Sequence, residues 1–476
     1  MWLQAPDYWL SRLLFERALG VIYVIAFLVA ANQFRPLLGE NGLLPVPRFL
    51  RVARFSNHPS IFYLHYSDRF LSACAWSGVA LGALIVLGLP ELAPPWVSIL
   101  VLFALWALYL SIVNVGQTFY AFGWESLLVE TGFLAILLGN GRMAPPTLLI
   151  WLLRWLLFRL EFGAGLIKIR GDRCWRNFTC LYYHHETQPM PNPLSWYFHH
   201  LPRPLHKVEV LGNHFAQLVV PFVIFAPQPF AGIAGLIMLL TQGWLVLSGN
   251  FSWLNAITML LTLSCFDDGM IRTVLPIGTP HLAAPPGWWQ ASVIALTIVV
   301  ALLSYWPIRN LLSRRQLMNY TFNPIHIVNA YGAFGSITKE RYEVVIEGAR
   351  DERGGPGAWK EYEFKGKPGD TRSRPTQVAP YHLRLDWLMW FAAMSTPTSH
   401  PWFVPLIVKL LTNDAPTPRL LRSNPFPERP PAVVRARLYR YRFSTPEERR
   451  ATRAWWVRTP VGEYLPPVRL QANGAR

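Results

Sequence analysis

Three ionisable residues stand seven positions apart within one apolar stretch of the chain: Arg154, Glu161 and Lys168. Seven residues of an α-helix fall about 20° short of two turns, so a helix would carry all three on one face, about 10.5 Å apart in rise. Charged groups inside a membrane span are costly and normally face the bundle interior, where they pair. Two interpretations stay open: a buried structural ion-pair network, or a site that handles a ligand or a proton.

A further deep carboxylate, Glu130, lies in the neighbouring apolar stretch 123–139. A carboxylate at that depth needs a cationic partner. The sequence predicts that Arg159 or Arg154 supplies it.

Half of the 12 histidines are crowded into one region, and they are His184, His185, His199, His200, His206 and His214. A zinc protease helix needs HExxH, whereas His185 and Glu186 begin HETQP, which ends in proline. Paired histidines without a carboxylate spacing do not predict a metal site, so none is expected. The interleaved tyrosines and tryptophans favour a half-buried loop at a membrane interface.

Two of the four cysteines, Cys174 and Cys180, are close in the sequence CWRNFTC. This spacing is neither CxxC nor that of a zinc ribbon. A local disulfide and two free thiols both remain open, and an oxidising compartment would favour the disulfide. Cys74 and Cys265 lie in predicted spans and are interpreted as small packing residues.

Several function classes lack their motifs. GxGxxG, GxxxxGK[ST] and GxSxG are absent, which argues against nucleotide binding and serine hydrolase chemistry, and no cofactor is expected. The net charge is +17, and 27 basic against 14 acidic residues lie after residue 308. Because this basic segment directly follows a span, attraction to an anionic membrane surface explains it better than nucleic-acid binding.

The elements that would position these residues are membrane helices. Of 476 residues, 52% are hydrophobic and 15% charged, which excludes an all-soluble protein. A span needs roughly 20 apolar residues. About nine candidate spans meet or approach that length, and they are 14–34, 70–89, 96–114, 123–139, 147–168, 208–227, 230–248, 252–266 and 289–306.

A smaller β-rich, sandwich-like domain is expected to follow this multi-pass α-helical bundle. Strand-like patterns cover 342–347 and 359–364, and two short apolar helices are expected at 385–394 and 402–411. The arginines of 433–443 switch face along a third strand, which a bulge or an exposed edge strand would explain. The expected division is a membrane domain at 1–308 with a long loop at 169–207, a linker at 309–330, and a soluble domain at 331–476.

The long loop carries a family resemblance. The run GAGLIKIRGDRCWRNFTCLYYHHETQPMPNPLSWYFHHLP is similar to the signature region of the lipase maturation factors, as are PLLGENGLLP at 36–45 and GNHFAQLVVPF at 212–222. The resemblance covers nearly the whole chain, although Phe122, Gly123, Trp124 and Glu125 depart from the family's usual aromatic-Gln-Trp-Asp. It implies a membrane protein that helps secreted lipases, or similar hydrolase clients, to fold and assemble. The Arg- and Pro-rich composition suits a bacterial member.

The first functional hypothesis is therefore a non-enzymatic membrane chaperone whose stiff loop and β-rich domain contact a client. The expected client-binding residues are Trp175, His184, His185, Glu186, Pro189, Pro191 and Trp196. The alternative, also from resemblance, is an intramembrane enzyme similar to vitamin K-dependent carboxylase that acts on a lipid-like or quinol substrate. Its catalytic candidates would be Lys168, Glu161, Arg154, Glu130 and His184. A passive scaffold is a third possibility.

The orientation in the membrane stays open. The positive-inside rule would place the basic loop 169–207 in the cytoplasm. The family resemblance instead implies the lumenal face of the endoplasmic reticulum in a eukaryote, or the outer face of the inner membrane in a bacterium.

Overall fold

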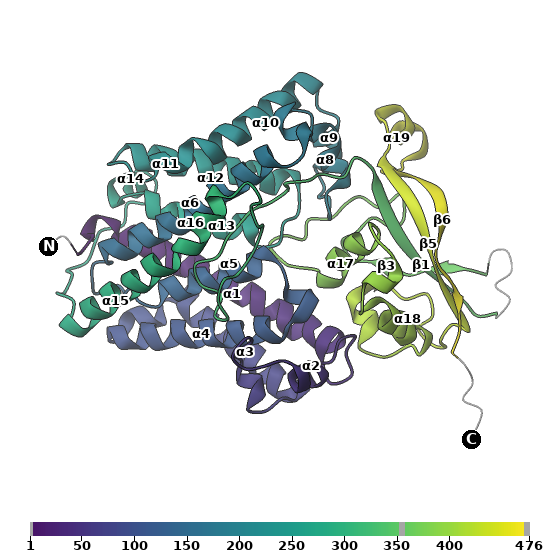
Figure 1. Cartoon of the computed structure of the whole chain (residues 1–476), viewed down its shortest axis with the longest axis horizontal. Helices are drawn as coiled ribbons and strands as arrows, with labels where there is room; N and C mark the ends of the chain where they lie inside the picture. Colours follow the sequence, from purple (N-terminus) through teal and green to yellow (C-terminus); the bar gives the residue numbers. More distant parts are fainter. Residues whose placement is uncertain (1–2, 352–357, 471–476) are drawn as a thin grey trace.

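The computed structural model describes residues 3–351 and 358–470. It has a helical part and a sheet-bearing part, which stand side by side in Figure 1. The α-helices of the first part are α1 (Trp9–Leu38), α2 (Val46–Val52), α3 (Asp68–Leu87), α4 (Pro95–Val115), α5 (Gly123–Ala135), α6 (Thr147–Arg170), α7 (Arg173–Arg176), α8 (Leu181–Thr187), α9 (Ser195–His199), α10 (Arg203–Leu218), α11 (Val220–Val223), α12 (Phe230–Ser248), α13 (Leu254–Thr262), α14 (Asp268–Arg272), α15 (Gly287–Leu303) and α16 (Tyr305–Leu312).

Five helical segments of the described chain are long and apolar enough to cross a membrane, and they are Pro6–Leu38, Asp68–Leu87, Pro95–Val115, Phe230–Ser248 and Gly287–Leu312. Each coincides with a predicted span. The helical membrane architecture is therefore confirmed, whereas the count of nine is not.

The other four predicted spans differ from these for physical reasons. Helix α5 has 13 residues and α13 has nine, which is too short to cross. The stretch 208–227 is divided between α10 and α11, and Pro221 lies at the start of the second helix. Helix α6 is long enough, with 24 residues, but it carries several charges.

Helix α6 is continuous and central, as the heptad-spaced charges predict. It packs against α5, α10, α13 and α15. Arg154, Glu161 and Lys168 are all buried within the protein, at 4%, 3% and 5% exposure. Neighbouring helices, and not lipid, thus surround the three charged groups.

The sheet-bearing part contains strands β1 (Arg341–Ala349), β2 (Lys360–Glu361), β3 (Glu363–Phe364), β4 (Leu421–Ser423), β5 (Val433–Phe443) and β6 (Trp456–Val468), with helices α17 (Arg384–Ala392), α18 (Phe403–Leu411) and α19 (Pro446–Thr452). Among the described residues, four strands form an antiparallel sheet in the order β2-β1-β5-β6, and β3 pairs with β4.

Strand β5 lies inside the sheet, so the edge-strand explanation of its arginines is wrong. Its register against β6 shifts at three places, including the step between Leu438 and Tyr439. At each shift the extra residue stands in β6, whereas β5 pairs residue for residue with β1 from Val433 to Tyr441, so the bulge expected in β5 is not found there either. The side chains of β5 alternate regularly, which places Arg435 and Arg437 on one face and Arg440 and Arg442 on the other.

The second layer of the expected sandwich is made by helices. Helix α17 packs against β1, and α18 packs against β5, on the side of the sheet that faces the helical part (Figure 1). The apolar residues of 385–394 and 402–411 form these helices, as predicted, and their buried faces take the place that a second sheet would have in a sandwich.

Buried polar contacts dock α17 onto the helical part. The Arg384 guanidinium lies 2.7 Å from Oε1 of Glu125 in α5, and donates to the Phe119 carbonyl at 2.7 Å. It also stacks 3.4 Å from the centroid of the Tyr120 ring. The side chain of Gln33 in α1 hydrogen-bonds the backbone of His382 and Arg384. These contacts fix the position of α17 relative to the membrane helices.

The same junction is expected to weaken in acid. Burial, aided by the Arg384 charge, lowers the pKa of His382 to about 4. Between about pH 6.5 and 4, His382 binds a proton in the unfolded chain but not in the folded one. The free energy of unfolding is therefore unaffected by this group above about pH 6.5, and it falls by up to about 3 kcal/mol as the pH drops toward 4. Comparing thermal unfolding of the wild type and His382→Gln from pH 7.5 to 4 measures this, and equal pH slopes would contradict it.

Candidate functional site

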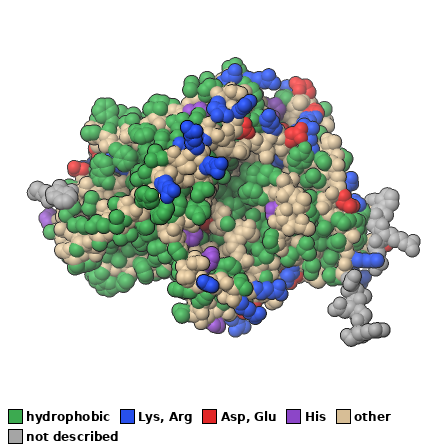
Figure 2. Space-filling model, in the orientation of Figure 1, with side chains coloured by type: hydrophobic (Ala, Val, Ile, Leu, Met, Phe, Trp, Pro, Cys, Tyr) green, Lys and Arg blue, Asp and Glu red, His purple; other side chains and the backbone are tan. Residues whose placement is uncertain are grey.

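A cavity of about 1200 Å³ lies between the helical part and α17. Helices α6, α8, α10 and α12 contribute to its walls, together with α17 and the connecting segment around residues 331–338. Figure 2 shows a hollow on the displayed face, bordered largely by hydrophobic side chains. The cavity is thus made by both parts of the molecule.

Glu161 and Lys168 form a polar patch on this cavity. Glu161 accepts hydrogen bonds from Gln217 (3.0 Å) and Gln242 (2.6 Å). The Lys168 ammonium donates to Gln217 (2.8 Å) and Asn213 (3.2 Å). Gln217 thereby bridges the two charges. The patch can hold a polar or charged group of an otherwise apolar ligand.

The amide side chains that complete this patch were not predicted from the sequence. Asn213 and Gln217 come from α10, and Gln242 comes from α12. Their signal is present: polar side chains recur on one side of the stretch 208–227, where a lipid-facing span would be apolar throughout.

The other two deep charges of the prediction lie apart from this patch. Arg154 donates to the Ser264 carbonyl (2.9 Å) and to the Tyr8 hydroxyl (2.8 Å). Glu130 pairs with Arg159, as one of the two predicted alternatives has it, and also accepts hydrogen bonds from Asn329 and Tyr331. For these residues the contacts are those of a buried structural network. Since Tyr331 also lines the cavity, this network supports its wall.

The apolar wall opposite is the surface of α17 and the residues after it. Trp387, Trp390, Phe391 and Met394 all line the cavity. Trp387 is buried, whereas Phe391 and Met394 keep 38% and 43% exposure. Trp390 donates from its indole to the Thr187 carbonyl (3.1 Å), which fixes this helix against α8. Phe391, whose ring centroid lies 6.5 Å from that of Phe122, and Met394 therefore keep part of their apolar surface open to the cavity.

The loop 169–207 contacts both parts of the molecule, and its middle portion around residues 184–192 is mostly buried. Trp175, His184, His185 and Pro189 line the cavity. Glu186 turns to the sheet, where its carboxylate accepts a hydrogen bond from the Phe443 backbone (2.7 Å).

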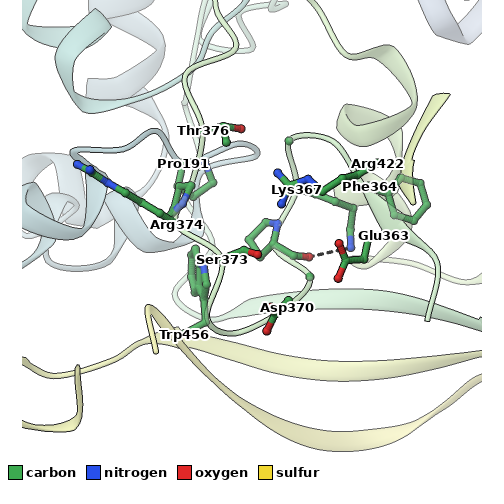
Figure 3. A pocket seen from close by; sticks show the side chains of 14 residues that line it. Pro191, Glu363, Phe364, Lys367, Asp370, Ser373, Arg374, Thr376, Arg422 and Trp456 are labelled. Carbon is green, nitrogen blue, oxygen red and sulfur yellow. Dashed lines mark hydrogen bonds between the residues drawn. The ribbon is translucent and has the colours of Figure 1, made fainter. Parts of the chain in front are cut away.

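Two other residues proposed for client binding face the sheet-bearing part. The Trp196 indole donates to the Ser444 carbonyl (2.9 Å). Pro191 lines a separate small pocket with Lys367, Arg374 and Trp456 (Figure 3). That pocket holds about 20 Å³, room for about one water molecule. It is too small for a substrate or a client segment.

Cys174 and Cys180 are joined by a disulfide. It closes the short turn around α7, at the edge of the cavity. Reducing it, or replacing both cysteines by serine, is expected to lower stability by about 2 kcal/mol through the chain entropy of the unfolded state. Thermal unfolding with and without reductant measures this. Mass spectrometry after alkylation without reductant should find neither cysteine labelled, and labelling of both in the folded protein would contradict the bond.

Two known family domains match the sequence of this chain. A family described as "Lipase maturation factor transmembrane domain" matches residues 10–273, and one described as "Lipase maturation factor C-terminal domain" matches residues 327–466. The chain belongs to the lipase maturation factor family. The two matched regions correspond to the helical and the sheet-bearing parts, so the cavity lies between the two family domains.

Relatives match over nearly their whole length. Human lipase maturation factor 1 is 44% identical over 98% of this chain and 89% of its own length. The cattle protein of the same name is 44% identical, with 98% and 91% covered. Human lipase maturation factor 2 is 30% identical, with 97% and 83% covered. No solved structure matches. The resemblance seen in the signature region is confirmed.

Proposed function

We propose that this protein is a membrane-bound maturation factor that assists secreted lipases in folding and assembly. Its relatives are named lipase maturation factors, which supports a lipase as the client. The observation that carries the proposal is the cavity, because both family domains build its walls and its open apolar surface includes Phe391 and Met394.

The physical role of the cavity is to cover apolar surface of an immature client. A subunit that has not yet met its partner exposes a contiguous apolar patch, which would otherwise aggregate. The α17 wall offers aromatic and thioether side chains for such a patch. The patch of Glu161 and Lys168, with its bridging amides, would hold a polar group at the end of the inserted segment. Release follows when the client buries that segment in its own interface.

The carboxylase-like enzyme alternative is not favoured. The family match is to maturation factors, and both Glu161 and Lys168 already have two amide partners each. These contacts show a polar patch that holds its charges in place, and the family match is what argues against the enzyme.

We further propose that the loop 169–207 faces an oxidising compartment. The disulfide between Cys174 and Cys180 persists only where thiols are not kept reduced. That compartment is the lumen of the endoplasmic reticulum in a eukaryotic cell, or the periplasm in a bacterium. This placement agrees with clients that are secreted, and it sets aside the positive-inside assignment.

Helix α6 is proposed as an additional crossing beside the five apolar helices. Its 24 residues rise about 36 Å, enough to span the hydrocarbon core. Its charges are buried against other helices, so lipid does not meet them. Residues 1–308 would then anchor the protein, and residues 331–476 would close the client cavity from the side.

Co-expression tests this function. Cells without a maturation factor of their own would produce a secreted dimeric lipase with or without this chain, and the specific activity of the secreted lipase would be measured. We expect it to rise with the chain present, while a secreted monomeric hydrolase of another class stays unchanged. Equal lipase activity in both cultures, with the chain shown to be in the membrane, would overturn the proposal.

A further inference from the structure

His185 is a buried imidazole without a hydrogen-bond partner. It lies in α8, is 3% exposed, and neither Nδ1 nor Nε2 has a partner among the described residues. Buried polar atoms are nearly always paired, and an imidazole always has one nitrogen that can accept. Both nitrogens of His185 can therefore take a further partner, either a water molecule or a bound ligand.

Two potential metal ligands face His185 from α10. His206 and Glu209 stand three residues apart, on neighbouring positions of one helix face. One ligand atom from each of the three residues lies within 4.8 Å of the others. The His206 Nδ1 is 3.0 Å from Oε2 of Glu209, while its Nε2 has no partner. Three donors thus converge on one point from two helices.

The surroundings hold this set in the form that binds metal. The other carboxylate oxygen of Glu209 accepts a hydrogen bond from the Trp244 indole (3.0 Å), which orients the carboxylate as outer partners of metal ligands do.

From this geometry we propose that His185, His206 and Glu209 bind a zinc ion. Two imidazole nitrogens and one carboxylate oxygen are the three-ligand set of zinc sites that keep a fourth position open. Tetrahedral ligands about 2 Å from zinc lie about 3.3 Å apart, so small side-chain rotations close the present spacing. His185 and Glu209 both line the large cavity, so the fourth position faces the cavity.

The ion would join α8 to α10. Between α8 and α10, the ring centroids of His185 and His206 are 5.8 Å apart, and the Arg203 guanidinium lies 5.4 Å from the Tyr182 ring. A bound cation would fix that wall of the cavity and offer an open coordination position to a carboxylate or carbonyl of whatever enters. The sequence did not predict this set, because its ligands stand on separate helices and not in one HExxH motif.

The test measures zinc in the intact protein. The full chain, purified in detergent, would be stripped with EDTA, exposed to zinc sulfate, dialysed and analysed by plasma mass spectrometry. We expect about one zinc per chain in the wild type, and less than about a tenth of that in His206→Ala and Glu209→Gln. His200→Gln, a half-buried histidine of the same loop with its own backbone partner, serves as the matched control and should keep its zinc.

The unfolding temperature distinguishes a variant that has lost the zinc site from one that has lost the fold. The unfolding temperature in EDTA should be the same for wild type and Glu209→Gln, whereas added zinc should raise only that of the wild type. Cobalt in place of zinc should give the visible absorption of a four-coordinate site in the wild type alone. A wild-type chain that keeps no zinc after dialysis, or variants that keep as much as the wild type, would overturn the proposal.

Discussion

Replacing Arg384 by methionine is expected to destabilise the protein by about 3–5 kcal/mol, because it leaves the Glu125 carboxylate buried without its cation. Both side chains are fully buried, and the guanidinium also covers the Tyr120 ring. Loss of this contact should free α17 from the helical part and open the cavity wall. Thermal unfolding in detergent, together with limited proteolysis around residue 380, measures both effects.

Two variants control this expectation. Arg450→Met removes an exposed arginine of α19 and should change the stability by less than about 0.5 kcal/mol. The double variant Glu125→Leu and Arg384→Met removes both charges and should recover part of the loss, since no unpaired charge stays buried. A single variant as stable as the wild type would contradict the docking role of this pair.

Replacing Gly212 by tryptophan is expected to abolish most of the maturation activity while leaving the fold intact. Gly212 lines the cavity from α10, and a Cβ at this position would meet no atom within 4 Å. An indole can therefore enter the cavity without disturbing the helix. Since an aromatic side chain covers 150–250 Å², we expect secreted lipase activity to fall to about a tenth or less, equivalent to at least 1.4 kcal/mol of lost binding.

A matched glycine is available on the neighbouring helix. Gly243 in α12 likewise has open space around an added Cβ, but it is not among the residues that line the cavity. Gly243→Trp should leave lipase maturation near the wild-type value. If the two variants reduce activity equally, the cavity does not hold the client.

The helices and strands could be predicted from the sequence where the pattern of residues within one segment determines its structure. The heptad spacing of Arg154, Glu161 and Lys168 predicts α6 as one helix with a buried charged face, and the structure has it. The strand-like pattern at 342–347 predicts β1. The long strand β6 was missed, because Pro460, Pro466 and Pro467 interrupt its pattern. Short helices such as α13 were taken for spans because hydropathy alone does not show where a helix ends.

The site was predictable only in part, for a related reason. Lys168, Glu161 and His184 stand within one stretch of sequence, and all three line the cavity. The opposite wall, at Phe391 and Met394, is more than 200 residues away along the chain. Periodicity shows that 385–394 is a helix with an apolar stripe, but not what that stripe faces. Docking through Arg384 and Glu125, which decides this, is a tertiary contact with no local sequence signal.

Site-specific photo-cross-linking tests directly whether an immature lipase enters the cavity. A benzoylphenylalanine in place of Phe391 would be activated in cells that produce a secreted lipase, with the same group at Val404, an exposed apolar residue of α18 outside the cavity, as control. We predict a cross-link from position 391 to the immature lipase that disappears when Gly212→Trp fills the cavity, and none from position 404. Equal cross-linking from both positions, or none from 391 while the lipase still matures, would contradict the account.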